Sequence, residues 1–131
     1  MAIQIVLNYF YGLIIGYLLE LAYRSFQDKK LIKPIFINLQ MYGLAGIILF
    51  LIYRADVAFY YKILSIFFIT TGIELIVGSL YLKYKKIKLW DYSHEFMNYK
   101  GIICLRFSVY WLIASLIYLY LVLPYLDKLL R

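Results

Sequence analysis

Four long hydrophobic runs, separated by short polar connections, dominate the pattern along the chain. The runs cover residues 3–23, 35–53, 59–82 and 102–126. A helix needs about 20 apolar residues to cross a hydrocarbon core of about 30 Å, and each run is close to that length. Continuous apolar runs of this kind predict transmembrane helices rather than the amphipathic helices of a soluble fold.

Composition supports this interpretation. Hydrophobic residues make up 66% of the 131 positions, whereas ordinary soluble domains are about 45–50% apolar. We therefore expect an all-α, polytopic protein in which residues 1–131 form one membrane domain of two helical hairpins. The single cysteine, Cys104, excludes an internal disulfide, and with the single histidine, His94, it offers no metal-ligand spacing. No metal and no cofactor are expected.

The basic residues of the connections predict the orientation, because Lys and Arg in short loops favour the cytoplasmic side. Connections 24–34 and 83–101 are both basic. We expect both in the cytoplasm and both termini outside, in a multi-pass protein of the bacterial plasma membrane. The basic residues are Arg24, Lys29, Lys30 and Lys33 in the first connection, and Lys83, Lys85, Lys86 and Lys88 at the start of the second.

The four lysines at the start of connection 83–101 form a candidate patch for a partner or for anionic lipids at the inner face, where each is worth about 1 kcal/mol. No nucleic-acid partner is expected. The N-terminus lacks the basic region and cleavage signal of a signal peptide, so the first helix is expected to remain in the mature protein.

Apart from Lys62 at the outer end of the third span, three charged residues fall within or near the predicted spans: Glu20, Glu74 and Arg106. A charge at a helix centre costs about 2.5–3.5 kcal/mol on insertion scales, so such residues usually face other helices or a wet cavity. We place all three in the inner half of the membrane and predict that Arg106 pairs with Glu74, Glu20 or both. Such a cluster is a substrate or ion site, a proton-linked switch, or a buried ion-pair lock.

Small residues mark candidate packing faces beside both carboxylates. Gly12 and Gly16 precede Glu20 at spacings of four, and Gly78 follows Glu74 at the same spacing. Small residues at this spacing allow helix backbones to approach closely. A faint internal repeat points the same way, since four residues recur 54 positions later: Ile15, Glu20, Leu21 and Ser25 become Ile69, Glu74, Leu75 and Ser79.

The connection 83–101 concentrates hydrogen-bonding side chains that a plain tether would not need. They are Trp90, Asp91, Tyr92, Ser93 and Asn98, with Gly101 after them. Asp91 or Ser93 could cap the fourth helix. A catalytic role would ask Asp91, His94 or Glu95 to act as a base, but no nucleophile or metal partner accompanies them. No catalytic residue is therefore predicted.

The same residues carry a resemblance to a known family. The run Leu89 to Ser93, followed by Asn98, Gly101, Ile103 to Leu105, Ser108 and Trp111, resembles the type IV ABC-transporter permease family, also called CmpB-like. Tyr42 and Gly43 in the second helix agree with it, although Lys33-Pro34 and Gln40-Met41 depart from the family pattern. The resemblance implies a membrane transport component, and it leads us to expect Tyr42 and Trp90 in the same inner-leaflet layer.

Three functions remain open at this point. The first is a permease subunit that works as a homo-oligomer or with a membrane or ATPase partner, since the chain has no phosphate-binding loop of its own. The second is a non-transporting accessory, regulatory or immunity-like membrane protein. The third is a small lipid-headgroup enzyme, which would require Asp91, His94 and Glu95 to converge on one cavity.

Overall fold

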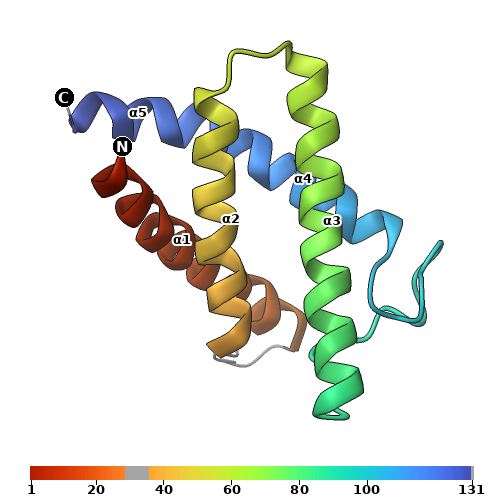
Figure 1. Cartoon of the computed structure of the whole chain (residues 1–131). Coiled ribbons are helices and arrows are strands. Elements are labelled where there is room, and N and C mark those ends of the chain that lie inside the picture. The colour runs from red at the N-terminus through yellow and green to blue at the C-terminus, as the bar shows by residue number, and fades with distance from the viewer. Residues whose placement is uncertain (29–35, 131) are drawn as a thin grey trace. The chain divides into compact units, whose positions relative to one another are not determined.

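The computed structural model describes residues 1–28 and 36–130, and the described parts contain helices and no β-strand. Figure 1 shows the elements, which follow one another as α1 (Ala2–Asp28), α2 (Phe36–Arg54), α3 (Phe59–Tyr84), α4 (Leu105–Ile117), the π-helical turn η1 (Tyr118–Val122) and α5 (Leu123–Leu129). The last three are continuous, so the described chain has four helices that are long and apolar enough to cross a membrane. The predicted all-α membrane fold is confirmed.

The helix ends differ from the predicted ones for identifiable reasons. The fourth span begins at Leu105 rather than residue 102, because Cys104 is extended, with φ −150° and ψ 158°. The amide of Tyr99 donates to the Ile103 carbonyl at 2.9 Å, so the residues before Cys104 belong to the connection. The start expected at residue 35, and the basic residues Lys29, Lys30 and Lys33, lie outside the described residues.

The chain divides into two compact units, Met1–Ala55 and Asp56–Arg131. In the first unit, α1 and α2 pack as a hairpin whose contact is made by glycines. A Cβ on Gly46 would collide with the Asn8 carbonyl and lie 2.9 Å from the Gly12 Cα, and a Cβ on Gly16 would collide with the Tyr42 ring. Backbones this close require the small-residue seam that membrane helices use for van der Waals packing.

In the second unit, polar side chains join the helices. The Thr71 hydroxyl of α3 donates to the Ser108 hydroxyl of α4 at 2.8 Å. Ser108 is buried, and lipid chains offer no hydrogen-bond partner, so the bond from Thr71 satisfies the Ser108 hydroxyl. The helices that flank connection 85–104 are thereby held together one turn from Glu74.

Large apolar side chains cover the outside of the helices. Ile3, Phe68 and Ile76 are 72%, 67% and 61% exposed. Soluble monomers rarely expose large contiguous apolar surfaces. Hydrocarbon chains are the solvent that suits these side chains, as expected for membrane-spanning helices.

The fourth span contains a wide turn. Within η1 the backbone makes i to i−5 hydrogen bonds, and the Leu123 amide donates to the Tyr118 carbonyl. Pro124 follows directly, near the start of α5. A proline lacks the amide that would continue an α-helical ladder, and a π-helical turn is one way to accommodate this loss without breaking the helix.

The glycine seam of the first unit can be tested with Gly46→Ala. The added Cβ meets backbone atoms that cannot rotate away, so we expect a loss of about 1–3 kcal/mol in the free energy of unfolding, typical of overpacking. The measurement is unfolding in lipid bicelles by steric trapping. Gly72→Ala is the matched control, because a Cβ there meets no atom within 4 Å; equal losses in both variants would contradict the close packing.

Candidate functional site

Connection 85–104, between α3 and α4, is an ordered segment held by backbone hydrogen bonds between its own residues. The Tyr92 amide donates to the Gly101 carbonyl at 2.8 Å, and the Glu95 amide donates to the Tyr92 carbonyl at 2.9 Å. The amide of Ile102 donates to the Tyr99 carbonyl at 3.0 Å. These bonds bring the start and end of the connection together, so its side chains have fixed positions.

Asn98 holds the middle of the connection. Its side-chain amide donates to the carbonyls of Ser93 at 3.3 Å and Glu95 at 3.0 Å, and its Oδ1 accepts from the Gly101 amide at 3.0 Å. Gly101 has φ +68°, and a Cβ there would lie 3.0 Å from Asp91 Oδ1. A side chain at this position would therefore be both strained and crowded.

Asp91 closes a turn within the connection. Its Oδ1 accepts from the Ser93 amide at 3.0 Å. Hydrogen bonds from the Ser93 hydroxyl and amide lower the pKa of Asp91 below its usual value, and the nearby charges of Lys88 and His94 act in the same direction. The expected cap on the fourth helix is wrong, because the residue at the cap position is Cys104, without a side-chain cap bond.

Trp90 joins the two ends of the connection and packs against α3 at Gly78. Its indole donates to the Ile102 carbonyl at 2.7 Å. A Cβ on Gly78 would lie 2.5 Å from Ile102 Cγ2 and 3.2 Å from the Trp90 ring. The glycine in α3 therefore makes room for the connection, and Leu89, Ile102 and Cys104 are buried there.

Glu74 lies where α3, α4 and the connection meet, and it is buried. Its Oε1 accepts from the Trp111 indole at 2.6 Å and from the Tyr92 hydroxyl at 3.3 Å. The Tyr92 ring stacks on Phe107 with 4.5 Å between centroids and 13° between planes. Oε2 has no hydrogen-bond partner among the described residues.

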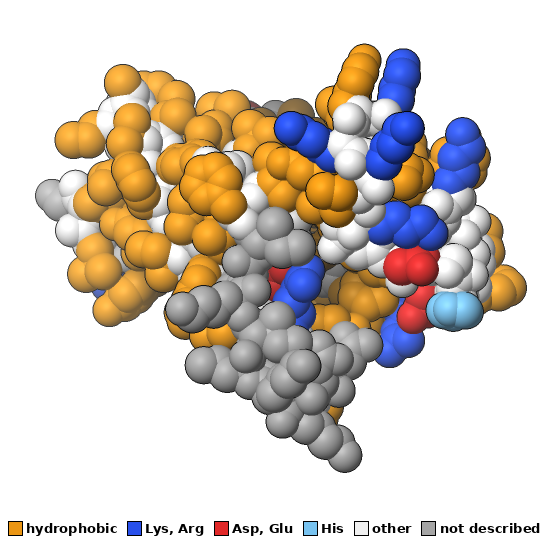
Figure 2. Space-filling model, turned by 90° about the horizontal axis from the view of Figure 1, so that it is seen from below, with side chains coloured by type: hydrophobic (Ala, Val, Ile, Leu, Met, Phe, Trp, Pro, Cys, Tyr) orange, Lys and Arg blue, Asp and Glu red, His pale blue; other side chains and the backbone are white. Residues whose placement is uncertain are grey.

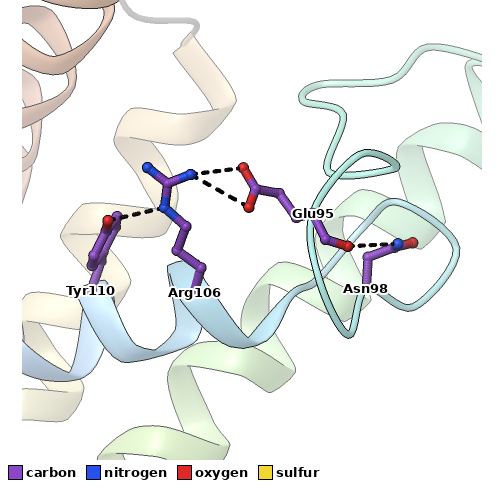
Figure 3. Close-up of polar contacts among 4 residues, drawn as sticks. All are labelled: Glu95, Asn98, Arg106 and Tyr110. Carbon is purple, nitrogen blue, oxygen red and sulfur yellow. Dashed lines mark hydrogen bonds and ion pairs between the residues drawn. The ribbon is translucent and has the colours of Figure 1, made fainter.

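Arg106 does not pair with Glu74. Its Nη1 lies 3.2 Å from Glu95 Oε1, and its Nε donates to the Tyr110 hydroxyl at 2.9 Å (Figure 3). The predicted pairing with Glu74 is wrong, because α4 begins only one residue before Arg106, whose long side chain reaches the connection instead. The carboxylate of Glu95 therefore has Arg106 as its cationic partner. The alternative pairing with Glu20 would join the two units and stays a prediction.

In the first unit, Glu20 has different partners. Its Oε1 lies 2.7 Å from the Nε of Arg24 and accepts from the side-chain amide of Asn38 at 2.9 Å. Glu20 and Asn38 are buried. Tyr42 and Gly43 lie in the same hairpin, where Gly43 faces the Tyr9 ring. Tyr42 and Trp90 lie in different units, so their expected location in the same inner-leaflet layer stays a prediction.

Exposed lysines surround the end of α3 and connection 85–104. Figure 2 shows Lys and Arg side chains gathered on the face seen from below. Lys88 lies 3.8 Å from Asp91, and Lys83 and Lys100 lie over the rings of Tyr84 and Tyr99. Lys85 and Lys86 are also exposed. The role of the patch, for lipid or protein, stays a prediction.

Asp91 accepts a hydrogen bond from Ser93, and Glu95 pairs with Arg106. The described residues contain no group of three His, Cys, Asp or Glu side chains that could hold a metal.

Trp111 was used in the sequence analysis only as part of the family resemblance, and the hydrogen bond that it donates to Glu74 was not predicted. An indole in an apolar run is a usable signal, because a buried indole N–H needs an acceptor.

The family model described as "Putative ABC-transporter type IV" matches residues 7–131, nearly the whole chain. No curated protein and no solved structure matches the chain in the corresponding comparisons. The matched range includes connection 85–104, Glu20 and Glu74.

The order of the connection is expected to depend on the ionisation of Asp91. Because the pKa of Asp91 is lowered by bonds made in the folded turn, the stabilisation is present at neutral pH and is lost as pH falls through the lowered pKa. Hydrogen-exchange protection of residues 91–95, corrected for intrinsic exchange rates, should decrease in acid. Asp91→Asn keeps an acceptor but has no charge, so its protection should not change with pH; a wild-type-like acid transition in this variant would contradict the assignment.

Proposed function

Because the chain belongs to the type IV ABC-transporter family, we propose that it is a membrane-embedded transport subunit that works in an oligomer with a separate ATPase chain. Connection 83–101 is the docking segment for that ATPase on the cytoplasmic side. The lysines at the start of this segment contact anionic lipid, and the tip of the segment contacts the ATPase. Both termini lie outside the cell in this arrangement.

The observation that carries the proposal is the tip of the connection. Phe96 and Met97 are 78% and 66% exposed, although the backbone on either side is held by the bonds of Asn98. Met97 also has φ +51°. An ordered segment that presents large apolar side chains in a strained backbone is typical of a binding surface, and burying such a side chain is worth about 1.5–3 kcal/mol.

The lysines support the placement of the segment. Lys83, Lys85 and Lys86 are exposed at the end of α3 and just after it, where an anionic leaflet attracts each by about 1 kcal/mol. They would hold the end of α3 at the membrane surface and leave Phe96 and Met97 free to meet a protein. Four spans leave little room for a translocation path within one copy, which favours an oligomer.

Docking can be tested by extracting the protein from its native membrane in mild detergent and identifying what co-purifies by mass spectrometry. A stoichiometric ATP-binding subunit is expected with the wild type. The double variant Phe96→Ser, Met97→Ser should reduce its recovery about tenfold or more, because two apolar contacts are lost.

Val57→Ser is the matched control, because Val57 is 49% exposed in the other described connection, between α2 and α3. It should leave ATPase recovery unchanged. Recovery of the wild type as a pure homo-oligomer, or with an unrelated membrane protein, would overturn the ATPase proposal and favour an accessory or immunity-like role.

Orientation can be tested separately by cysteine labelling of intact cells with a membrane-impermeant maleimide. In a Cys104→Ser background, Val57→Cys should react from outside, whereas Phe96→Cys should react only after permeabilisation. Both side chains are exposed, so accessibility does not limit the reaction. The reverse pattern would place connection 83–101 outside and exclude cytoplasmic docking.

A further inference from the structure

The two units each bury one carboxylate in a similar local arrangement. Glu20 accepts from Asn38, and Glu74 accepts from Tyr92. Both donors lie 18 residues after their acceptor, and the two pairs are 54 residues apart. The offset of 54 residues is also the one at which the sequence around the two glutamates repeats. The surroundings of Glu20 and Glu74 can therefore be compared position by position.

The two carboxylates differ in their counter-charge. Glu20 pairs with Arg24 at 2.7 Å. The position 54 residues after Arg24 is Gly78, whose missing side chain is replaced by the packing of Trp90 and Ile102. An arginine therefore has no room beside Glu74, and the two glutamates cannot be neutralised in the same way.

No cationic side chain of its unit contacts Glu74 among the described residues. α4 contributes the neutral indole of Trp111, and the connection contributes the hydroxyl of Tyr92. The Cys104 thiol lies within electrostatic reach, and burial raises its pKa, so it stays neutral. Arg106, the basic residue of α4, pairs with Glu95.

Both donors to Glu74 converge on Oε1, while Oε2 is buried without a partner among the described residues. The residue is only 6% exposed. An ionised carboxylate in such a position would keep a full charge in a medium of low dielectric, and buried groups in this situation take up a proton instead. A metal cation would need several ligands, and the described residues contain no group of three or more His, Cys, Asp and Glu side chains that could hold one.

We propose that Glu74 is a proton-binding site, occupied on Oε2 at neutral pH, whereas Glu20 has the counter-charge of Arg24. The proton comes from bulk water and returns to it when connection 85–104 lifts and exposes the carboxyl group. Tyr92 forms part of the cover, so movement of the connection and release of the proton are linked. This inference goes beyond the transport proposal and does not require an ATPase partner.

Infrared spectroscopy of the full chain in lipid vesicles tests the proposal directly. A protonated carboxyl group has a C=O stretch separate from the amide and carboxylate bands, and the band shifts in deuterated water. At neutral pH the wild type should show this band, Glu74→Gln should lose it, and Glu20→Gln should keep it. Absence of the band in the wild type, or its persistence in Glu74→Gln, would overturn the proposal.

Sodium titration at constant pH separates a proton site from a general cation site. The band should keep its intensity as NaCl is raised. A saturable loss of the band, with the carboxylate band growing in its place, would mean that Glu74 binds the metal cation and would overturn the proton assignment.

Thermal unfolding gives a second readout that does not depend on band assignment. Glutamine mimics the neutral carboxyl group, so Glu74→Gln should unfold near the wild-type temperature at neutral pH and become the more stable of the two as pH rises. Glu20→Gln breaks the Arg24 ion pair and should be less stable than the wild type at both neutral and alkaline pH. A Glu74→Gln difference that is independent of pH would contradict the proposal.

Discussion

The hydrogen bonds that Trp111 and Tyr92 donate to Glu74 join three parts of the unit Asp56–Arg131: α4, the connection and α3. A bilayer supplies no water to a buried polar atom, so each of these groups depends on the others for a partner. Losing one partner leaves a buried group unsatisfied, at a cost of about 1–3 kcal/mol. The position of the whole connection therefore depends on a carboxyl group inside the membrane-spanning region.

The two hairpins solve the problem of helix association differently. In Met1–Ala55, Gly12 and Gly46 bring backbones into contact and dispersion forces act over a long seam. In Asp56–Arg131, Thr71 and Ser108 form a hydrogen bond between helices, and Gly78 admits the connection rather than another helix. The first hairpin is therefore held by backbone contact along a glycine seam, whereas the second is held by hydrogen bonds between side chains.

Length and apolar composition were sufficient to predict the four spans, because crossing a membrane constrains both strongly. Trp90, Asp91 and Asn98 were singled out in the sequence as hydrogen-bonding side chains, and each forms a hydrogen bond within the connection. The partner of Arg106 was not predictable, because it depended on where α4 begins and on a fold of the connection with no regular period. Trp111 was concealed by the apolar run around it. Polar contacts across turns are set by backbone geometry that spacing alone does not encode.

The π-helical turn of the fourth span has a geometric effect on everything after it. A wide turn adds one residue to the helix, and one residue corresponds to a rotation of about 100°. The stripe that α4 presents with Ser108 and Ser115 is therefore not continued by α5, which presents a rotated surface. Within this one span, the corresponding surfaces of α4 and α5 face in different directions, so the two ends of the span can contact different neighbours in the bilayer.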